Sequence, residues 1–185
     1  MKKIMIDMDD VLVKDDFIGR ISKFAGKKFT EDDAGSYYLQ DLLGDKKEAF
    51  FEEFKKINMY DSVELMDNVV EVVKKLNENY DVYICTAYIW REIIDDCGII
   101  LKQKYDYLRE KFPFLDPFKF IFTASKNVIK ADIKIDDRID NLEGGNIKLL
   151  YTAYHNKNIS NEQLEKQGII RVNNWLDIKK ILLDK

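Results

Sequence analysis

The stretch KKIMIDMDDVLV, residues 2–13, places an apolar run directly before closely spaced carboxylates. The run at 4–6 predicts a buried first strand over residues 2–6, and Asp7 and Asp9 follow where this strand ends. Two carboxylates this close repel each other unless nearby groups compensate their charge. We therefore expect their partners at the ends of neighbouring strands.

Polar residues also follow three later points in the chain. Thr86 closes the apolar run of VYICTAY, Lys126 lies in TASKNVIK, and Asp136 and Asp137 close ADIKIDD. Taken singly, each has an ordinary explanation, because Asp and Thr are common in turns and most lysines are solvated. The order acid pair, threonine, lysine, acid pair, with three members ending strand-like runs, indicates a single functional site.

This set of residues suits phosphoryl transfer, which needs a nucleophile, a proton donor for the leaving oxygen and positive charge around the phosphate. We predict that Asp7 attacks phosphorus and forms an aspartyl-phosphate. Asp9 would protonate the leaving group and then deprotonate the attacking water. Lys126 would neutralise the nucleophile's charge, while the Thr86 hydroxyl and nearby backbone N–H groups, including that of Ala87, would hold a phosphate oxygen.

A divalent cation is the expected cofactor of this site. So many carboxylates would repel a dianionic substrate unless a cation bridged them, and a hard, oxygen-rich site with few protein ligands suits Mg²⁺. The predicted ligands are Asp7, the main-chain carbonyl of Asp9, and Asp136. Asp137 is expected to support the site by orienting its neighbours.

Composition bounds the class of protein. The chain has 185 residues, of which 46% are hydrophobic, enough for one sizeable core and a small appended lobe. Lys and Arg total 30 against 34 Asp and Glu, a net charge of −4, and no basic block points to a nucleic-acid polymer as partner. A monomer and a homodimer are both compatible with the sequence.

The sequence also predicts a cytoplasmic location without a membrane partner. No apolar run approaches the ~20 residues that span a bilayer. Asp7 interrupts what would otherwise be the apolar region of a signal peptide. Cys85 and Cys97 show no CxxC pairing, and Cys85 lies inside a strand-like run, as expected of a reduced core residue.

Strand-like and helical segments alternate along most of the chain. This predicts an α/β fold in which a Rossmann-like parallel sheet is covered by helices on both faces, with the site at the carboxyl ends of the strands. Helices are expected at 68–77, at about 89–111 and in the tail, where Asn173 or Asn174 is the N-cap. The predicted strands after the first are 80–85, 118–123, 132–135, 147–151 and 169–172.

Residues 14–66 depart from this alternation and are rich in helix formers, charge and aromatic side chains. We predict that 1–13 and 67–185 form the core domain and that 14–66 form a small helical domain. A lobe of this size has few other residues for a core, so most of its aromatics are expected inside it. These aromatics are Phe17, Phe24, Phe29, Tyr37, Tyr38, Phe50, Phe51, Phe54 and Tyr60.

The motifs IDMDDVL and KADIKIDDR, with Thr86 and the TASK loop between them, resemble those of the haloacid dehalogenase-like (HAD) phosphatases, and within them the 5′(3′)-deoxyribonucleotidases. The resemblance extends from Ile4 through the tail and places Lys126, rather than Lys130, at the family's lysine position. The chain departs from the family at Asp10, where Gly is frequent. It departs again after Thr86, where a small polar residue and Pro are replaced by Ala87 and Tyr88.

This resemblance implies a HAD-like core with a helical cap inserted at 14–66, which closes over the phosphate site and contacts the nucleoside. It also implies an Mg²⁺-dependent phosphatase whose small-molecule substrate is a (deoxy)nucleoside monophosphate. Phe17, just beyond the loop that leaves Asp9, and Tyr60, near the return to the core, are the predicted cap residues that face the substrate.

Three alternatives stay open at this point. A phosphatase for a non-nucleotide phosphomonoester would use the same catalytic groups. A phosphorelay receiver also combines acids, Thr and Lys, but it would leave Asp136 and Asp137 without a role. A binding module without hydrolase activity could share the fold. His155, in the polar stretch AYHNKNIS, is expected to be a surface residue.

Overall fold

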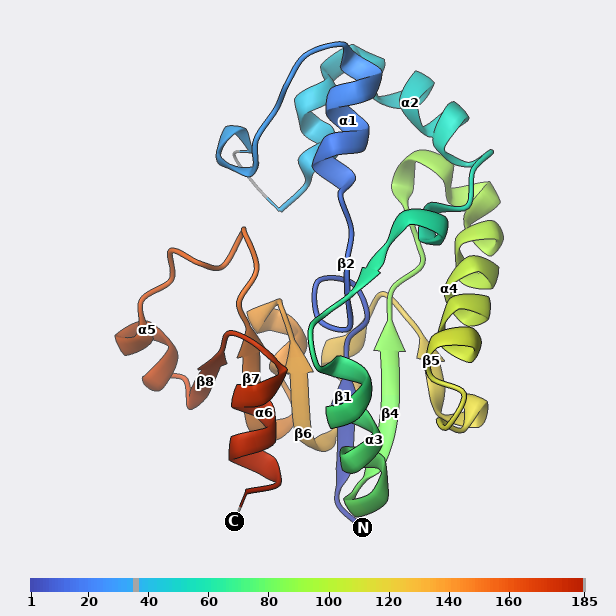
Figure 1. The fold of residues 1–185 in the computed structure, drawn as a ribbon. Helices are drawn as coiled ribbons and strands as arrows, with labels where there is room; N and C mark the ends of the chain where they lie inside the picture. Colours follow the sequence, from blue (N-terminus) through green and yellow to red (C-terminus); the bar gives the residue numbers. More distant parts are fainter. Residues whose placement is uncertain (35–36, 185) are drawn as a thin grey trace.

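The computed structural model describes residues 1–34 and 37–184. Its centre is a sheet with the strand order β5-β4-β1-β6-β7-β8, in which every pairing is parallel (Figure 1). The strands are β1 Lys3–Ile6, β4 Asp81–Thr86, β5 Phe120–Phe122, β6 Ala131–Asp136, β7 Gly145–Tyr151 and β8 Ile169–Val172. The predicted α/β fold with a parallel sheet is confirmed.

β1 is a central strand, and its register sets the position of the site. Its apolar side chains at 4–6 are at most 1% exposed, as expected of a strand covered on both faces. Ile6 pairs with Ile84 of β4 on one side and with Ile135 of β6 on the other. The residues that follow these strands therefore meet at one edge of the sheet.

Two helices cover one face of the sheet side by side. They are α3 Val69–Asn79 and α6 Trp175–Leu182, which lie in front of the strands in Figure 1. The Tyr80 hydroxyl donates a hydrogen bond of 2.8 Å to the Leu182 carbonyl and ties their ends together. Of the two candidate N-caps for the last helix, Asn174 is the one used, because its side chain accepts from the Asp177 N–H at 3.0 Å.

The longest helix, α4 Cys97–Lys111, is shorter than the predicted helix at 89–111. The residues before it form a 3-10 segment, η4 Arg91–Asp96, which is kinked at Ile93. The Trp90 ring packs 5.3 Å from that of Phe17, and Ile93 is only 4% exposed. Burial of Ile93 and packing of the half-buried Trp90 ring keep these residues out of the α-helix, so the predicted helix was wrong at 89–90 and is 3-10 rather than α-helical at 91–96.

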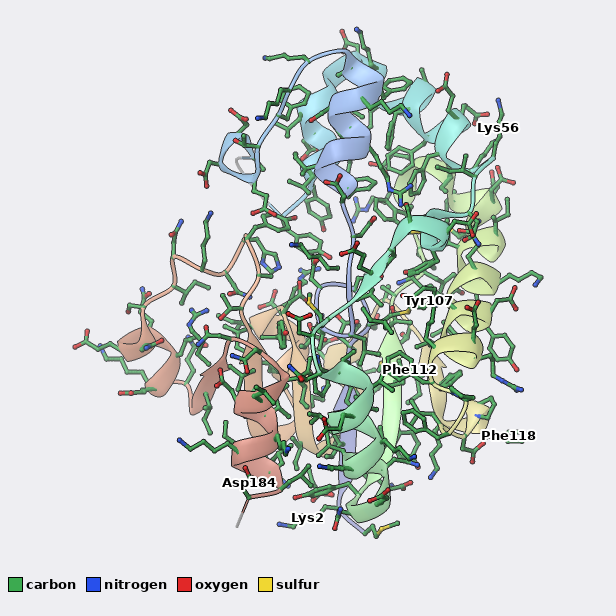
Figure 2. All side chains as sticks on the ribbon, viewed as in Figure 1. Lys2, Lys56, Tyr107, Phe112, Phe118 and Asp184 are labelled. Carbon is green, nitrogen blue, oxygen red and sulfur yellow. The ribbon has the colours of Figure 1, made fainter. Side chains whose placement is uncertain are left out.

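The inner side of α4 is mostly apolar, with Lys104 as its buried charged residue. Figure 2 shows Tyr107 and Phe112 on the side of the helix that faces the rest of the protein, whereas Phe118 lies at the outer edge of the molecule. Tyr107 is 6% exposed and Phe112 is fully buried. Cys85 and Cys97 are buried free thiols. No helix in the described ranges has the length and apolarity needed to span a membrane.

The inserted segment forms a lobe above the carboxyl ends of the strands (Figure 1). It contains α1 Phe17–Ala25 and α2 Lys47–Phe54, and it joins the core through an antiparallel ribbon of β2 Val13–Lys14 and β3 Glu64–Leu65. Phe50 and Phe51 pack edge to face with their ring centres 5.2 Å apart, and Phe17 and Phe54 join them. The predicted boundaries at 13/14 and 66/67 fall at this ribbon.

Short helices complete the fold. α5 Asn161–Glu165 begins at Ser160, whose hydroxyl accepts from the Gln163 N–H. The remaining 3-10 segments are η1 Glu31–Asp33, η2 Leu39–Lys46, η3 Met59–Ser62, η5 Pro117–Lys119, η6 Lys126–Val128 and η7 Ile139–Leu142.

Candidate active site

Three buried carboxylates lie at the carboxyl edge of the sheet. Asp7 follows β1 and Asp136 ends the adjacent β6, and the Asp7 N–H donates to the Ile135 carbonyl at 2.9 Å. One oxygen each from Asp7, Asp136 and Asp137 lies within 4.8 Å of the others. These residues are only 6%, 0% and 3% exposed, respectively. The structure therefore brings Asp7 of the first predicted acid pair together with the second pair, Asp136 and Asp137.

Lys126 lies between the two strands' carboxylates. Its Nζ is 2.5 Å from Asp7 Oδ1 and 3.1 Å from Asp136 Oδ2, and the residue is 3% exposed. Burial opposes its charge, but the carboxylates of Asp7 and Asp136 outweigh burial and raise the pKa of Lys126. The ammonium therefore stays protonated at neutral pH and gives the nucleophile candidate a fixed hydrogen-bond partner.

One ammonium does not compensate three buried carboxylates. Burial and the nearby Asp136 raise the pKa of Asp7 to about 6 despite Lys126, and burial also raises the pKa of both Asp136 and Asp137. All three residues offer carboxylate oxygens, which are the hard ligands that divalent cations such as Mg²⁺ prefer. The residues present therefore fit a divalent cation bound among them.

Asp9 lies in a different environment from Asp7. Its side chain is 42% exposed, and it forms an ion pair with Lys104 of α4 and accepts a hydrogen bond of 2.6 Å from the Tyr60 hydroxyl. Partial burial would raise the pKa of Asp9, but the Lys104 ammonium and these hydrogen bonds lower it below its ordinary value. In the protein without cation or substrate, Asp7 therefore binds a proton more readily than Asp9. A cation bound beside Asp7 would favour its carboxylate form and lower its pKa again.

Lys104 also links Asp9 to the predicted phosphate-binding residues. Its Nζ donates to the Thr86 hydroxyl at 2.7 Å, and the lysine itself is 2% exposed. The Thr86 hydroxyl in turn lies 3.3 Å from the carbonyl oxygen of Ala87. Two ammonium groups and a hydroxyl therefore lie at the carboxyl edge of the sheet, near the predicted nucleophile Asp7. They belong to Lys104, Lys126 and Thr86.

Neighbouring loops hold the second acid pair. Asp136 Oδ1 accepts from the Arg138 N–H at 3.0 Å and from the Asn141 side chain at 2.9 Å. His155 Nε2 lies 2.6 Å from Asp137 Oδ2, and its side chain is only 12% exposed. The expectation that His155 is a surface residue was wrong, because the turn after β7 folds back over the site and directs the ring at Asp137.

Asp10 has an unusual backbone conformation. Its φ of +57° lies in the left-handed region that favours glycine, which agrees with the frequent Gly at this place in the resembled family. Burial and the nearby Asp137 raise the pKa of Asp10 to about 8. The carboxyl group therefore adds little negative charge to the site at neutral pH.

The two predicted substrate-facing residues differ in position. Tyr60 is 3% exposed, with its hydroxyl on Asp9 and its ring 5.1 Å from that of Tyr107. Phe17 is 9% exposed within the aromatic cluster of the lobe. Tyr60 thus contacts the site through its hydroxyl, and Phe17 lies at the junction with the core residue Trp90.

The sequence interpretation missed Lys104, although its spacing carried a signal. α4 buries Cys97, Ile100, Lys104, Tyr107 and Leu108, and these positions recur at helical spacing. A lysine within such a buried stripe requires a polar partner, which the sequence does not name.

Comparison with known proteins is consistent with this geometry. A family model described as "5' nucleotidase, deoxy (Pyrimidine), cytosolic type C protein" matches residues 1–185. A Staphylococcus aureus protein named "Putative 5'(3')-deoxyribonucleotidase" is 34% identical over 99% of this chain and 96% of its own length. The "5'(3')-deoxyribonucleotidase" of Bacillus subtilis is 30% identical over 99% of this chain and 100% of its own length.

Solved structures agree in fold. A HAD hydrolase of family IA from Entamoeba histolytica superposes with a TM-score of 0.57 at 14% identity, covering 96% of this chain and 95% of its own. A HAD hydrolase from Bacillus subtilis, described as bound to magnesium, gives a TM-score of 0.55 at 14% identity over 98% of both chains. The fold is that of HAD hydrolases, and the family matched in sequence is one of nucleotidases. The chain belongs to the 5′ nucleotidase, deoxy (pyrimidine), cytosolic type C family, which confirms the resemblance found in the sequence.

The raised pKa of Asp7 predicts how pH affects stability. With its pKa raised from 3.8 to about 6, Asp7 binds a proton more tightly in the metal-free folded protein than in the unfolded chain. This stabilisation is complete at low pH and is lost as pH rises through 6, so on the order of 1–3 kcal/mol should disappear between about pH 4 and pH 7. Asp7→Asn should lose less stability over that range. Urea unfolding in EDTA measures the difference, and identical pH slopes for the two proteins would contradict the shift.

Proposed function

We propose that the protein hydrolyses nucleoside monophosphates, deoxyribonucleotides among them, through an aspartyl-phosphate on Asp7. The observation that carries the proposal is the position of Asp7, which is held by Lys126 beside Asp136 while Asp9 lies two residues further along the chain. Membership of a nucleotidase family supports the substrate class. Relatives with the name 5′(3′)-deoxyribonucleotidase support the deoxy form of the sugar.

In the first step, an Asp7 carboxylate oxygen attacks phosphorus. The new O–P bond forms as the bond from phosphorus to the nucleoside oxygen breaks. Asp9, which its ion pair with Lys104 keeps ionised in the substrate-free protein, takes up a proton from the substrate or solvent and gives it to that leaving oxygen. Lys126 offsets the charge on the nucleophile and on the transferred group. We assign Lys104 and Thr86, which are hydrogen-bonded to each other at 2.7 Å, as donors to the phosphate oxygens.

In the second step, water attacks the phosphorus of the aspartyl-phosphate. Asp9, now deprotonated, takes the proton of the water, and the bond between Asp7 and phosphorus breaks to release inorganic phosphate. The Tyr60 hydroxyl and Lys104 hold the Asp9 carboxylate from two sides. Through these contacts the same side chain stays in place for both proton transfers.

We propose Mg²⁺ as the cation, with Asp7, the main-chain carbonyl of Asp9 and Asp136 as ligands and Asp137 in a supporting position. When bound, Mg²⁺ supplies positive charge between these carboxylates and a phosphate oxygen. The excess of buried carboxylates over ammonium groups supports the assignment. His155 and Asn156 hold Asp137 by its side chain and its carbonyl, respectively.

Metal removal tests the cation directly. EDTA should abolish phosphate release and added Mg²⁺ should restore it. Asp136→Ala should raise the Mg²⁺ concentration that gives half-maximal activity, because it removes a ligand. Asp137→Ala should raise it less, in line with the about 10- to 100-fold effects of residues that orient metal ligands. Full activity of the protein in metal-free buffer would refute the assignment.

We propose that residues 14–66 act as a cap over the phosphate site. The lobe stands above the carboxyl ends of the strands and sends Tyr60 to Asp9 (Figure 1). Phe17 and the half-buried Trp90 meet at the junction of lobe and core, 5.3 Å apart, where an aromatic base could stack. Phe17 and Tyr60 therefore stay the proposed cap contacts, Tyr60 through its hydroxyl.

The aromatic pair of Phe17 and Trp90 predicts which substrates the protein prefers. Stacking of a base on an aromatic side chain contributes about 1–3 kcal/mol, and a sugar phosphate offers no such face. Nucleoside monophosphates should therefore have kcat/KM at least about tenfold above hexose or glycerol phosphates. A panel of phosphomonoesters measures this ratio, with Trp90→Leu as the variant that should reduce it. A sugar phosphate that exceeds every nucleotide would favour the non-nucleotide alternative.

A further inference from the structure

Lys134 is a fully buried lysine that the proposed reaction does not use. It lies on β6 with 0% exposure, although lysines normally keep their ammonium group in water. Its Nζ donates three hydrogen bonds to main-chain carbonyls, 2.9 Å to Lys126, 3.0 Å to Asn141 and 2.6 Å to Glu143. A lysine has three N–H donors, so the ammonium is fully hydrogen-bonded.

The three carbonyls belong to two loops that carry site residues. One is the loop of η6, which begins at Lys126, whose own ammonium lies between Asp7 and Asp136. The other is the loop of η7, where the Asn141 side chain donates to Asp136 Oδ1 at 2.9 Å. Lys134 therefore connects the backbone behind the candidate catalytic lysine to the backbone behind a residue that holds Asp136.

The neighbouring strand leaves room for the Lys134 side chain. Gly145 begins β7 beside it, and a Cβ at that position would lie 3.1 Å from Lys134 Cγ and 3.2 Å from Lys134 Cβ. These separations are shorter than ordinary carbon contacts of about 3.5–4.0 Å. Residues of both β6 and β7 thus surround the Lys134 side chain. A residue larger than glycine at 145 would displace that side chain.

Removing the ammonium would leave these carbonyls without that donor. The Lys126 carbonyl would keep the Ile129 N–H at 3.2 Å. A buried acceptor that loses a donor is unfavourable, so the Asn141 and Glu143 carbonyls would shift toward water or toward other donors. An apolar side chain at 134 would fill the same volume but would not prevent such a shift. The lysine thus fixes the relative position of the two loops rather than simply filling the core.

We propose that Lys134 is a positioning residue that acts through Lys126, a role that rests on the function proposed for that lysine. The buried ammonium holds the η6 and η7 loops together, so that the Lys126 ammonium stays in place against Asp7. Small displacements of reacting groups lower the rate steeply, since a shift of about 1 Å can cost about 10²-fold.

The test is the kcat of Lys134→Met with a nucleoside monophosphate at saturating Mg²⁺, at a temperature where circular dichroism shows each variant folded. We expect a loss of about 10- to 100-fold. Lys148→Met is the matched control, because Lys148 pairs with Lys134 in the β6–β7 register and is only partly buried. The control should keep the wild-type kcat. Lys134→Gln, which retains N–H donors on a shorter side chain, should show a smaller loss and serves if the Met variant does not fold.

A double mutant separates positioning from general stabilisation. If Lys134 acts through Lys126, Lys126→Ala and the double variant Lys126→Ala/Lys134→Met should have single-turnover rates within about threefold of each other. Multiplicative losses, or a folded Lys134 variant with wild-type kcat, would overturn the proposal. These outcomes are distinct from failure of the proposed function, in which the wild-type protein hydrolyses no nucleotide or Lys126→Ala has no effect.

Discussion

The ammonium of Lys126 lies between two buried carboxylates, 2.5 Å from Asp7 and 3.1 Å from Asp136, and the rest of the site is arranged around this contact. It joins the ends of β1 and β6 to the loop before β6. Without it, the buried acids would repel each other in a medium that screens charge poorly. With it, the remaining negative charge is suited to a divalent cation, and in the proposed reaction the same ammonium would offset charge on the attacked phosphate.

The strand register of the sheet places the two carboxylates of this contact close together. Parallel pairing sets Ile6 level with Ile84 and Ile135, so the residues that follow these strands meet at one edge without any special loop. The lobe contributes the Tyr60 hydroxyl, which donates a hydrogen bond to Asp9. In the proposed function, the sheet edge would bind the phosphate and the inserted lobe would contact the rest of the substrate.

The parallel sheet and the positions of the strand-end residues could be predicted because they depend on chain order and periodicity. Asp7 and Asp136 were found because each directly ends an apolar run. Lys104, Lys134 and His155 could not be assigned, because their partners come from distant elements and the direction of a side chain is set by packing. The predicted helix at 89–111 failed at its start for the same reason, since packing of Trp90 and burial of Ile93 outweigh local helical pattern.

The most direct test of the account is to trap the phosphorylated enzyme. Because Asp9 acts in both steps, the wild-type protein is used, and rapid acid quench during turnover of a ³²P-labelled nucleoside monophosphate should leave label on the protein. The account predicts that peptide mapping places this label on Asp7 and that Asp7→Asn carries none. Label on another residue, or steady turnover by Asp7→Asn, would contradict the assignment of Asp7 as nucleophile.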